Sequence, residues 1–394
     1  MQPTTIGDSS EALRISGRQI IDSRSDWIWS TAYQDGQRKA RTFPDAALIN
    51  QTDIVSSGGE VQYLFNSGAG QVISGAGYIN QEERFPLSDG AIVRTQGANG
   101  YAYGQWTALP SLVLSAGFAG EWFKLTNPFF PNAIERNVVS PKLGVVWSPV
   151  SGTTVRAAAF QAVRRPFVAS QTIEPTQIAG FNQFFTGFER FYGDIEGTIS
   201  KRVGLAIDQS VSRTAFLGIE VATRKLAVPS IIADRDFTWR EATAHAYLYK
   251  AFPARSAFLP PNLSVATTLE IDFERIERPQ ILTGPEGIMS LNTLMVPMGV
   301  KLFGNEGTTF GTSLTYVRQE GDFSIDEGLP VFNKNDAAWI TDIFVESRFP
   351  RRLGALALGV RNLFNQSLDL VETDPFNPRV ATRRFYYLKA TVTF

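Results

Sequence analysis

Hydrophobic and polar residues alternate along most of the chain. A period of two gives a β-strand one apolar face and one polar face. The alternation is clearest at 112–118, 203–207, 217–221, 263–273 and 294–302, most of which are parts of longer alternating runs. The pattern therefore predicts an all-β protein.

The length of these runs separates two kinds of all-β protein. Strands of soluble sandwiches and propellers average about 5–6 residues, whereas these runs extend over about 9–12 residues, which is enough to cross a bilayer at a tilt. Runs also end in aromatic residues, as at Trp122 and Phe273, and aromatic girdles mark both membrane interfaces of barrels. We therefore expect a transmembrane antiparallel β-barrel, with a soluble sandwich as the alternative.

The chain divides into about 16 such strands, an even number as in bacterial outer-membrane barrels. Short turns alternate with long loops, which places the turns and both termini in the periplasm. Residues 1–25 are expected to be a polar periplasmic lead-in, and residues 26–394 the barrel, with 165–195 as its longest loop. The strands are expected at 26–35, 52–65, 71–83, 96–108, 111–124, 137–148, 153–164, 196–209, 214–226, 237–251, 262–275, 291–303, 308–320, 338–349, 354–365 and 383–394.

Composition excludes several classes of function. There are 37 Lys+Arg and 38 Asp+Glu, a net charge of −1, so no basic field favours nucleic acid. With 0 Cys and 1 His, the chain cannot build a zinc finger, haem or iron–sulfur site on its own. The mean hydropathy of −0.08 is too polar for a bundle of membrane helices. No cofactor is expected.

The last strand carries an assembly pattern. Apolar side chains occupy every second position at its end, and the sequence given stops on Phe394. The signal residues are Tyr386, Leu388, Val392 and Phe394. This arrangement resembles the C-terminal signal by which the barrel assembly machinery recognises outer-membrane barrels. It implies a location in the outer membrane of a Gram-negative bacterium, in contact with lipid and lipopolysaccharide.

Three segments resemble a known family. Gly359-Val-Arg-Asn-Leu-Phe-Asn365, followed by a loop and a terminal strand, is similar to the end of a TonB-dependent receptor barrel. Ser140–Pro149 with Thr154–Phe160 resembles a hairpin of the same barrels, and Gln171–Phe185 is similar to barrels that follow tetratricopeptide repeats. The resemblance implies an outer-membrane transport protein. No plug domain, TonB box or 34-residue repeat is found in the sequence given, so the resemblance does not carry energy-coupled uptake over to this chain. We expect the chain to be a fragment or the barrel domain of a longer precursor, and the sequence leaves open whether a plug or a repeat domain precedes Met1.

The inward faces of several strands carry charge. We expect basic side chains on the earlier strands and acidic ones on the later strands to line the pore, either as opposed walls that orient polar solutes or as a mixed lining without selectivity. The pore-lining candidates are Arg156, Arg164, Arg202, Arg224, Glu241, His245, Glu270, Asp272 and Glu274.

Some of these residue types also occur in catalytic and metal-binding sites. His245 could serve as the base of a hydrolase, but no nucleophile-elbow pattern occurs, so we expect a polar pore residue and no enzyme. Glu270, Asp272 and Glu274 rise along one strand and do not converge. No metal site is therefore expected there.

The longest loop has a helical spacing of aromatic residues. Spacings of three and four are typical of an amphipathic helix, which would either fold into the lumen as a constriction or cap the rim. The aromatic residues are Phe181, Phe184, Phe185, Phe188, Phe191 and Tyr192.

Three functions fit this sequence. A channel or transporter would move polar solutes or a polymer across the outer membrane. An uptake receptor would need a plug domain, and the export pore of an exopolysaccharide or secretion system would need a periplasmic repeat domain.

Overall fold

The computed structural model of the chain describes residues 4–42, 48–129, 132–168, 171–184, 195–230, 235–254, 262–278, 288–304, 307–324, 331–349, 353–367 and 383–392. Within these ranges no helix is long and apolar enough to cross a membrane.

Seventeen strands form one antiparallel sheet, in which each strand pairs with the next along the chain. A two-strand hairpin, β9 and β10, interrupts the order between β8 and β11. The strands are β1 (Thr4–Ile20), β2 (Ser25–Thr42), β3 (Leu48–Ser67), β4 (Gly70–Phe85), β5 (Ala91–Leu109), β6 (Leu112–Thr126), β7 (Ile134–Trp147), β8 (Thr153–Val163), β9 (Gln177–Ile178), β10 (Phe181–Asn182), β11 (Ile199–Ser212), β12 (Ala215–Pro229), β13 (Asp236–Phe252), β14 (Ser264–Glu277), β15 (Ile288–Phe303), β16 (Thr308–Phe323), β17 (Phe332–Arg348), β18 (Gly354–Arg361) and β19 (Phe385–Val392).

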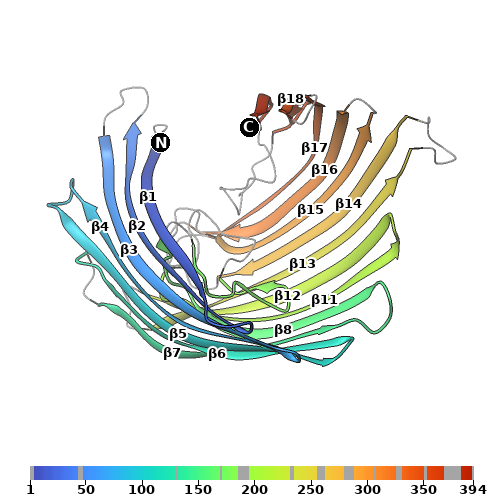
Figure 1. Cartoon of the computed structure of the whole chain (residues 1–394). Helices are drawn as coiled ribbons and strands as arrows, with labels where there is room; N and C mark the ends of the chain where they lie inside the picture. Colours follow the sequence, from blue (N-terminus) through green and yellow to red (C-terminus); the bar gives the residue numbers. More distant parts are fainter. Residues whose placement is uncertain are drawn as a thin grey trace.

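The sheet curls into a deep trough that is open along one side (Figure 1). Its edges are β1 and β19, and no backbone pair joins these two strands within the described ranges. The all-β antiparallel fold is thus confirmed, whereas closure into a barrel is not observed. All sixteen expected strands have a counterpart, from β2 to β8 and from β11 to β19.

The seventeenth strand is β1, which corrects the expectation of a polar lead-in over residues 1–25. β1 pairs with β2 along its whole length, from Thr4 opposite Thr42 to Ile20 opposite Asp26. Its sequence is too polar to show the alternation of apolar and polar residues that is typical of a membrane strand. Leu13 and Ile15 are the main apolar side chains of its outer face. The extra strand also places Thr4 at the end of the sheet that carries the long connections, and Val392 at the other end. The first and last described strands therefore begin and end at opposite ends of the sheet, and the expectation that both chain termini lie in the periplasm is not confirmed.

Exposure alternates along the strands as the hydrophobic period predicts. In β11, Val203, Leu205 and Ile207 are 56%, 47% and 41% exposed, while the intervening Ala206 is 1% exposed. Apolar residues on the convex face are thus exposed, whereas the concave face carries polar residues and packed small residues. A face of this kind suits a hydrocarbon solvent.

The terminal strand β19 pairs with β18 over its described length. Tyr386, Leu388 and Val392 are exposed, and Leu388 lies opposite Leu358 on the convex face. Phe394, the last residue of the expected assembly signal, lies outside the described residues.

Candidate functional site

The connection between β8 and β11 folds back onto the concave face of the sheet (Figure 1). Its described parts, residues 164–168 and 171–184, contact strands β1, β3 and β5, which lie several strands away from β8. We call these two described parts the inner loop. The inner loop therefore lies on the concave side of the sheet.

A buried ion pair holds the inner loop against the floor of the trough. Arg165 Nη2 lies 2.6 Å from Glu174 Oε2, and the two side chains are 5% and 1% exposed. Asn99 of β5 bonds to both, at 2.9 Å from Arg165 Nη1 and 2.8 Å from Glu174 Oε2. Tyr103 also donates its hydroxyl to Glu174. Removing one partner of such a pair leaves a buried charge, which costs about 3–5 kcal/mol.

A second set of contacts fixes the backbone of the inner loop to β3. The carboxylate of Glu60 accepts hydrogen bonds from Thr172 Oγ1 and Ile173 N, both at 2.6 Å. Gln62 Nε2 donates to the Ile173 carbonyl, also at 2.6 Å. These bonds satisfy backbone groups that would otherwise be buried without partners.

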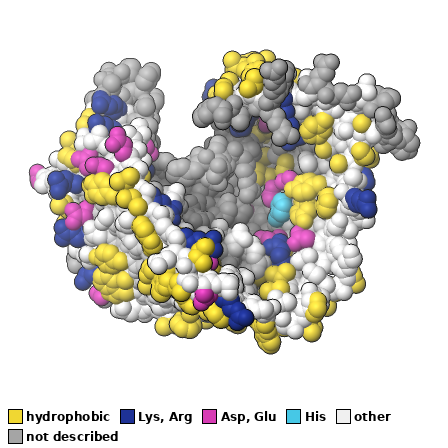
Figure 2. Space-filling view, in the orientation of Figure 1, with side chains coloured by type: hydrophobic (Ala, Val, Ile, Leu, Met, Phe, Trp, Pro, Cys, Tyr) yellow, Lys and Arg dark blue, Asp and Glu magenta, His cyan; other side chains and the backbone are white. Residues whose placement is uncertain are grey.

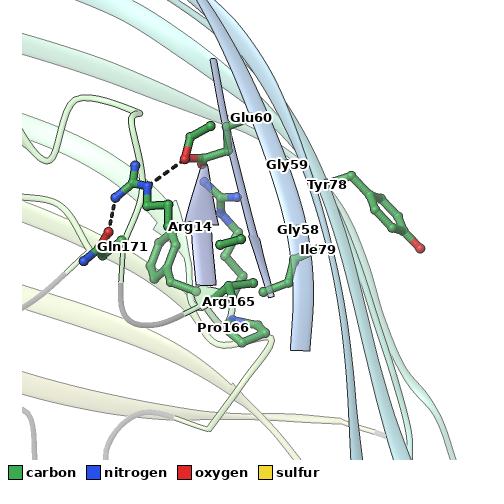
Figure 3. A pocket seen from close by; sticks show the side chains of 13 residues that line it. Arg14, Gly58, Gly59, Glu60, Tyr78, Ile79, Arg165, Pro166 and Gln171 are labelled. Atoms are coloured by element: carbon green, nitrogen blue, oxygen red, sulfur yellow. Dashed lines mark hydrogen bonds between the residues drawn. The ribbon is translucent and has the colours of Figure 1, made fainter. Parts of the chain in front are cut away.

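At the edge of the sheet, Arg14 of β1 donates to Gln171 of the inner loop (Figure 3). Arg165 and Pro166 lie beside the same contact. The partly open cavity there measures about 30 Å³, room for about one or two water molecules. At this edge the inner loop therefore leaves little space between itself and the sheet.

The tip of the inner loop is a tight hairpin and not a helix. Ala179 and Gly180 have φ angles of 48° and 86°, as both central residues of a type I′ turn require. The turn pairs Phe181 with Ile178 across β9 and β10. The helix expected from the aromatic spacing is therefore wrong for the first of these residues. Phe185, Phe188, Phe191 and Tyr192 lie outside the described residues.

Phe181 is 1% exposed and anchors this hairpin in an apolar cluster on the concave face. A Cβ at Gly204 of β11 would lie 2.3 Å from Cε1 of Phe181, so glycine is needed for the close approach of the ring. The guanidinium of Arg156 lies 5.4 Å from the centre of the same ring. Phe184 packs edge-on against Phe167 at 5.4 Å. The remaining cluster members are Tyr101, Tyr103, Ala119, Ala158, Phe160, Ile178, Ala179 and Ala206.

The other end of the connection between β8 and β11 carries the acidic residue Glu196, just before β11. Thr95 Oγ1 donates to Glu196 Oε2 at 3.1 Å. Burial raises the pKa of Glu196 to about 7, and the nearby carboxylate of Glu83 adds to the rise. Burial also raises the pKa of Glu174, although the Arg165 guanidinium opposes the effect.

The charged side chains of the wall are paired with one another. Arg156 bonds to Asp208 at 3.0 Å and to Glu220 at 3.3 Å. Arg224 and Glu241 are bonded at 2.6 Å and are 9% and 8% exposed. The strands that carry them, β8 and β11–β14, are consecutive in the sheet. The basic and acidic candidates therefore form one mixed wall and do not face each other as opposed walls.

The other two basic candidates lie near the inner loop. Arg202 Nη1 donates to the Asn182 carbonyl at 3.3 Å, so it contacts the loop tip directly. Arg164 lies immediately after β8, and its backbone pairs with Gly197 and Thr198.

A ladder of rings follows the inward face of β13. His245 stacks on Tyr247 at 5.8 Å, and Tyr247 stacks on Tyr249 at 4.8 Å between ring centres. Each ring bonds to a carboxylate: Tyr247 to Asp208 at 2.8 Å, Tyr249 to Glu270 at 2.9 Å, and His245 Nδ1 to Asp272 Oδ1 at 2.8 Å. The tyrosines were not among the expected site residues, although their positions in phase with His245 could have indicated them.

Of these side chains, His245, Glu270 and Asp272 border a hollow of about 480 Å³ on the inner wall. The single histidine, cyan in Figure 2, lies beside acidic side chains on that wall. Glu274 is buried and lies opposite Thr243, away from the histidine. Within the described ranges no serine hydroxyl is bonded to the His245 ring.

Comparisons with known proteins show similarity of structure and not of sequence. No protein-family model and no curated protein matches the chain. Among solved structures, the copper transporter OprC superposes with a TM-score of 0.67 at 11% identity, over 98% of this chain and 65% of that one. The FrpB iron transporter from Neisseria meningitidis gives 0.69 at 13%, over 97% and 62%.

The ferric citrate transporter FecA gives a TM-score of 0.64 at 14% identity, over 99% of this chain and 62% of FecA. The chain thus spans under two thirds of the length of these proteins. The predicted likeness to TonB-dependent receptor barrels is confirmed for the fold, and the association with tetratricopeptide repeats stays a prediction. The chain has the strand arrangement of an outer-membrane transporter barrel.

Proposed function

We propose that the chain forms the membrane-spanning wall of an outer-membrane transporter for polar solutes. The apolar convex face would contact lipid and lipopolysaccharide, and the polar concave face would line the route. The barrel assembly machinery would insert it. Support comes from the exposed alternate apolar positions, such as Val203, Leu205 and Ile207, and from the transporter fold.

The inner loop is the observation that carries this proposal furthest. It crosses the concave face and is held there by Arg165–Glu174 and by Glu60. A segment so placed narrows the route, because it occupies space that the sheet would otherwise leave to water. It therefore acts as a constriction that a solute or a partner must displace.

Uptake is the direction that the comparisons favour. The similar structures are described as transporters of copper, iron and ferric citrate and as an import receptor for ferric catecholate. They are also longer than this chain. An uptake receptor would use a plug domain, which is not part of the sequence given. The alternative is an export pore with a repeat domain, which rests on the resemblance of Gln171–Phe185.

Single-channel recording in planar bilayers tests the constriction. Deleting residues 176–192 should raise the conductance severalfold, because the deletion removes the Phe181 anchor together with the loop tip. The matched control deletes residues 87–90, the exposed connection between β4 and β5, and should leave the conductance unchanged. Equal conductance of the wild-type protein and the 176–192 deletion would exclude the inner loop as the obstruction.

A further inference from the structure

One cluster on the inner wall joins an imidazole to two carboxylates. His245 projects from β13, and Glu270 and Asp272 project from β14. His245 of β13 pairs directly with Asp272 of β14, and Glu270 lies two residues from Asp272 on β14. One ligand atom from each of the three lies within 4.8 Å of the other two.

We propose that His245, Glu270 and Asp272 bind a divalent transition-metal ion from the hollow. The class of ion follows from the donors. Imidazole nitrogen together with carboxylate oxygen suits zinc, copper or nickel, whereas magnesium and calcium prefer oxygen donors alone. The histidine therefore distinguishes this cluster from an ordinary group of acidic side chains.

The geometry needs little adjustment to hold such an ion. Bonds to nitrogen and oxygen are about 2.0–2.2 Å long, so two donors of one ion lie at most about 4.2 Å apart. The ligand atoms all lie within 4.8 Å of one another, so small side-chain rotations bring them within bonding distance of one ion. All three side chains come from adjacent paired strands, so the backbone that supports them is fixed.

Neighbouring residues support these donors. Tyr249 donates to Glu270 at 2.9 Å, and Tyr247 stacks on the His245 ring. Outer contacts of this kind orient metal ligands. Among the residues that line the hollow, the basic side chain is Arg202, which donates to the Asn182 carbonyl.

The ion would remain exchangeable. Three protein donors leave one or more coordination positions for water, which is typical of an open site and not of a closed structural one. The side chains of His245 and Asp272 are 38% and 19% exposed toward this side. The site would thus bind a metal ion reversibly on the inner wall. This goes beyond the proposed transport, because ion binding is measurable on the solubilised chain whether or not it transports.

The test is titration calorimetry of the full chain in detergent with Zn²⁺. A polyhistidine tag must be avoided, because His245 is the only histidine. We expect one site in the wild-type protein, with affinity reduced about tenfold to 100-fold in H245A, E270Q and D272N. The control is E277Q, which removes the same charge at the end of β14, and Mg²⁺ should not compete. Unchanged affinity in H245A, or equal loss in E277Q, would overturn the site.

A spectroscopic measurement covers variants that do not fold. The wild-type protein loaded with one equivalent of Cu²⁺ should show pulsed electron paramagnetic resonance modulation from the remote nitrogen of an imidazole. Because the chain has one imidazole, that signal identifies His245 as the ligand. Its absence in the wild-type protein would contradict the proposal without the need for any variant.

Discussion

Glu174 is the residue on which the polar contacts of the inner loop converge. It accepts hydrogen bonds from Arg165, Asn99 and Tyr103, which come from the loop itself and from β5. At 1% side-chain exposure, its charge has no access to water and depends on these donors. Much of the polar attachment of the loop to β5 therefore passes through this one carboxylate.

Replacing Glu174 with alanine should release the inner loop. The change leaves the Arg165 guanidinium buried without its partner, a cost of about 3–5 kcal/mol. Hydrogen exchange at the Ile173 amide, which now bonds to Glu60, should become much faster. The control is E346A, whose partner Arg348 is 69% exposed and which should have little effect. Unchanged protection of Ile173 in E174A would show that Glu60 and Gln62 hold the loop alone.

Glu196 should make the stability of the chain depend on pH. Its folded pKa is about 7 against an ordinary value of 4.5, so the folded state binds more protons between these values. Stability therefore falls as pH rises from about 4.5 to about 7, and is constant above that range. The glutamine in E196Q cannot ionise. The melting temperature of E196Q, relative to that of the wild-type protein, should therefore increase as the pH rises from about 4.5 to about 7. A difference between the two that is independent of pH would contradict the assignment.

At the scale of the elements, the positions of most strands could be predicted from the sequence. Which side chains of neighbouring strands come together at the site could not be predicted. The period of two predicted sixteen strands, because lipid on one side and polar contacts on the other act on alternate residues. β1 was missed because polar residues fill much of its outer face. The pairs His245–Asp272 and Arg156–Asp208 depend on strand register, and the hairpin at Ala179–Gly180 depends on two positive φ angles. Neither register nor φ leaves a periodic signal in one sequence.

Adjacent positions of β16 offer a test of the two faces. Leu314 is 38% exposed on the convex face, while the next residue, Thr315, borders the hollow. L314R should block insertion or reduce stability, since arginine facing lipid near the bilayer centre costs about 2–4 kcal/mol. T315R places the same charge toward the concave side and should be tolerated. The measurement is heat-modifiable migration after assembly, and equal behaviour of the two variants would argue against a lipid-facing convex surface.

At the scale of the whole molecule, the two ends of the sheet differ in their connections. Turns such as 148–152 and 213–214 are short, while the connection from β8 to β11 is long. Long loops face outward in outer-membrane barrels. The chain has no cysteine, so L87C and S151C each introduce a single thiol, one at either end. A membrane-impermeant maleimide should label L87C on intact cells, and S151C only after the outer membrane is permeabilised. Labelling of S151C on intact cells would reverse the orientation.

Within the described residues the sheet has an odd number of strands, and this number has a consequence for how the trough can become a closed wall. In a sheet where every strand is antiparallel to its neighbour, the first and the seventeenth strand run in the same direction, so β1 and β19 are parallel edges. Unpaired backbone groups in a bilayer cost several kcal/mol each, so neither edge can face lipid uncovered. Direct joining of these edges would need a parallel ladder, which bacterial outer-membrane barrels do not use. Closure by antiparallel ladders alone requires an odd number of additional strands between them, whichever polypeptide provides them.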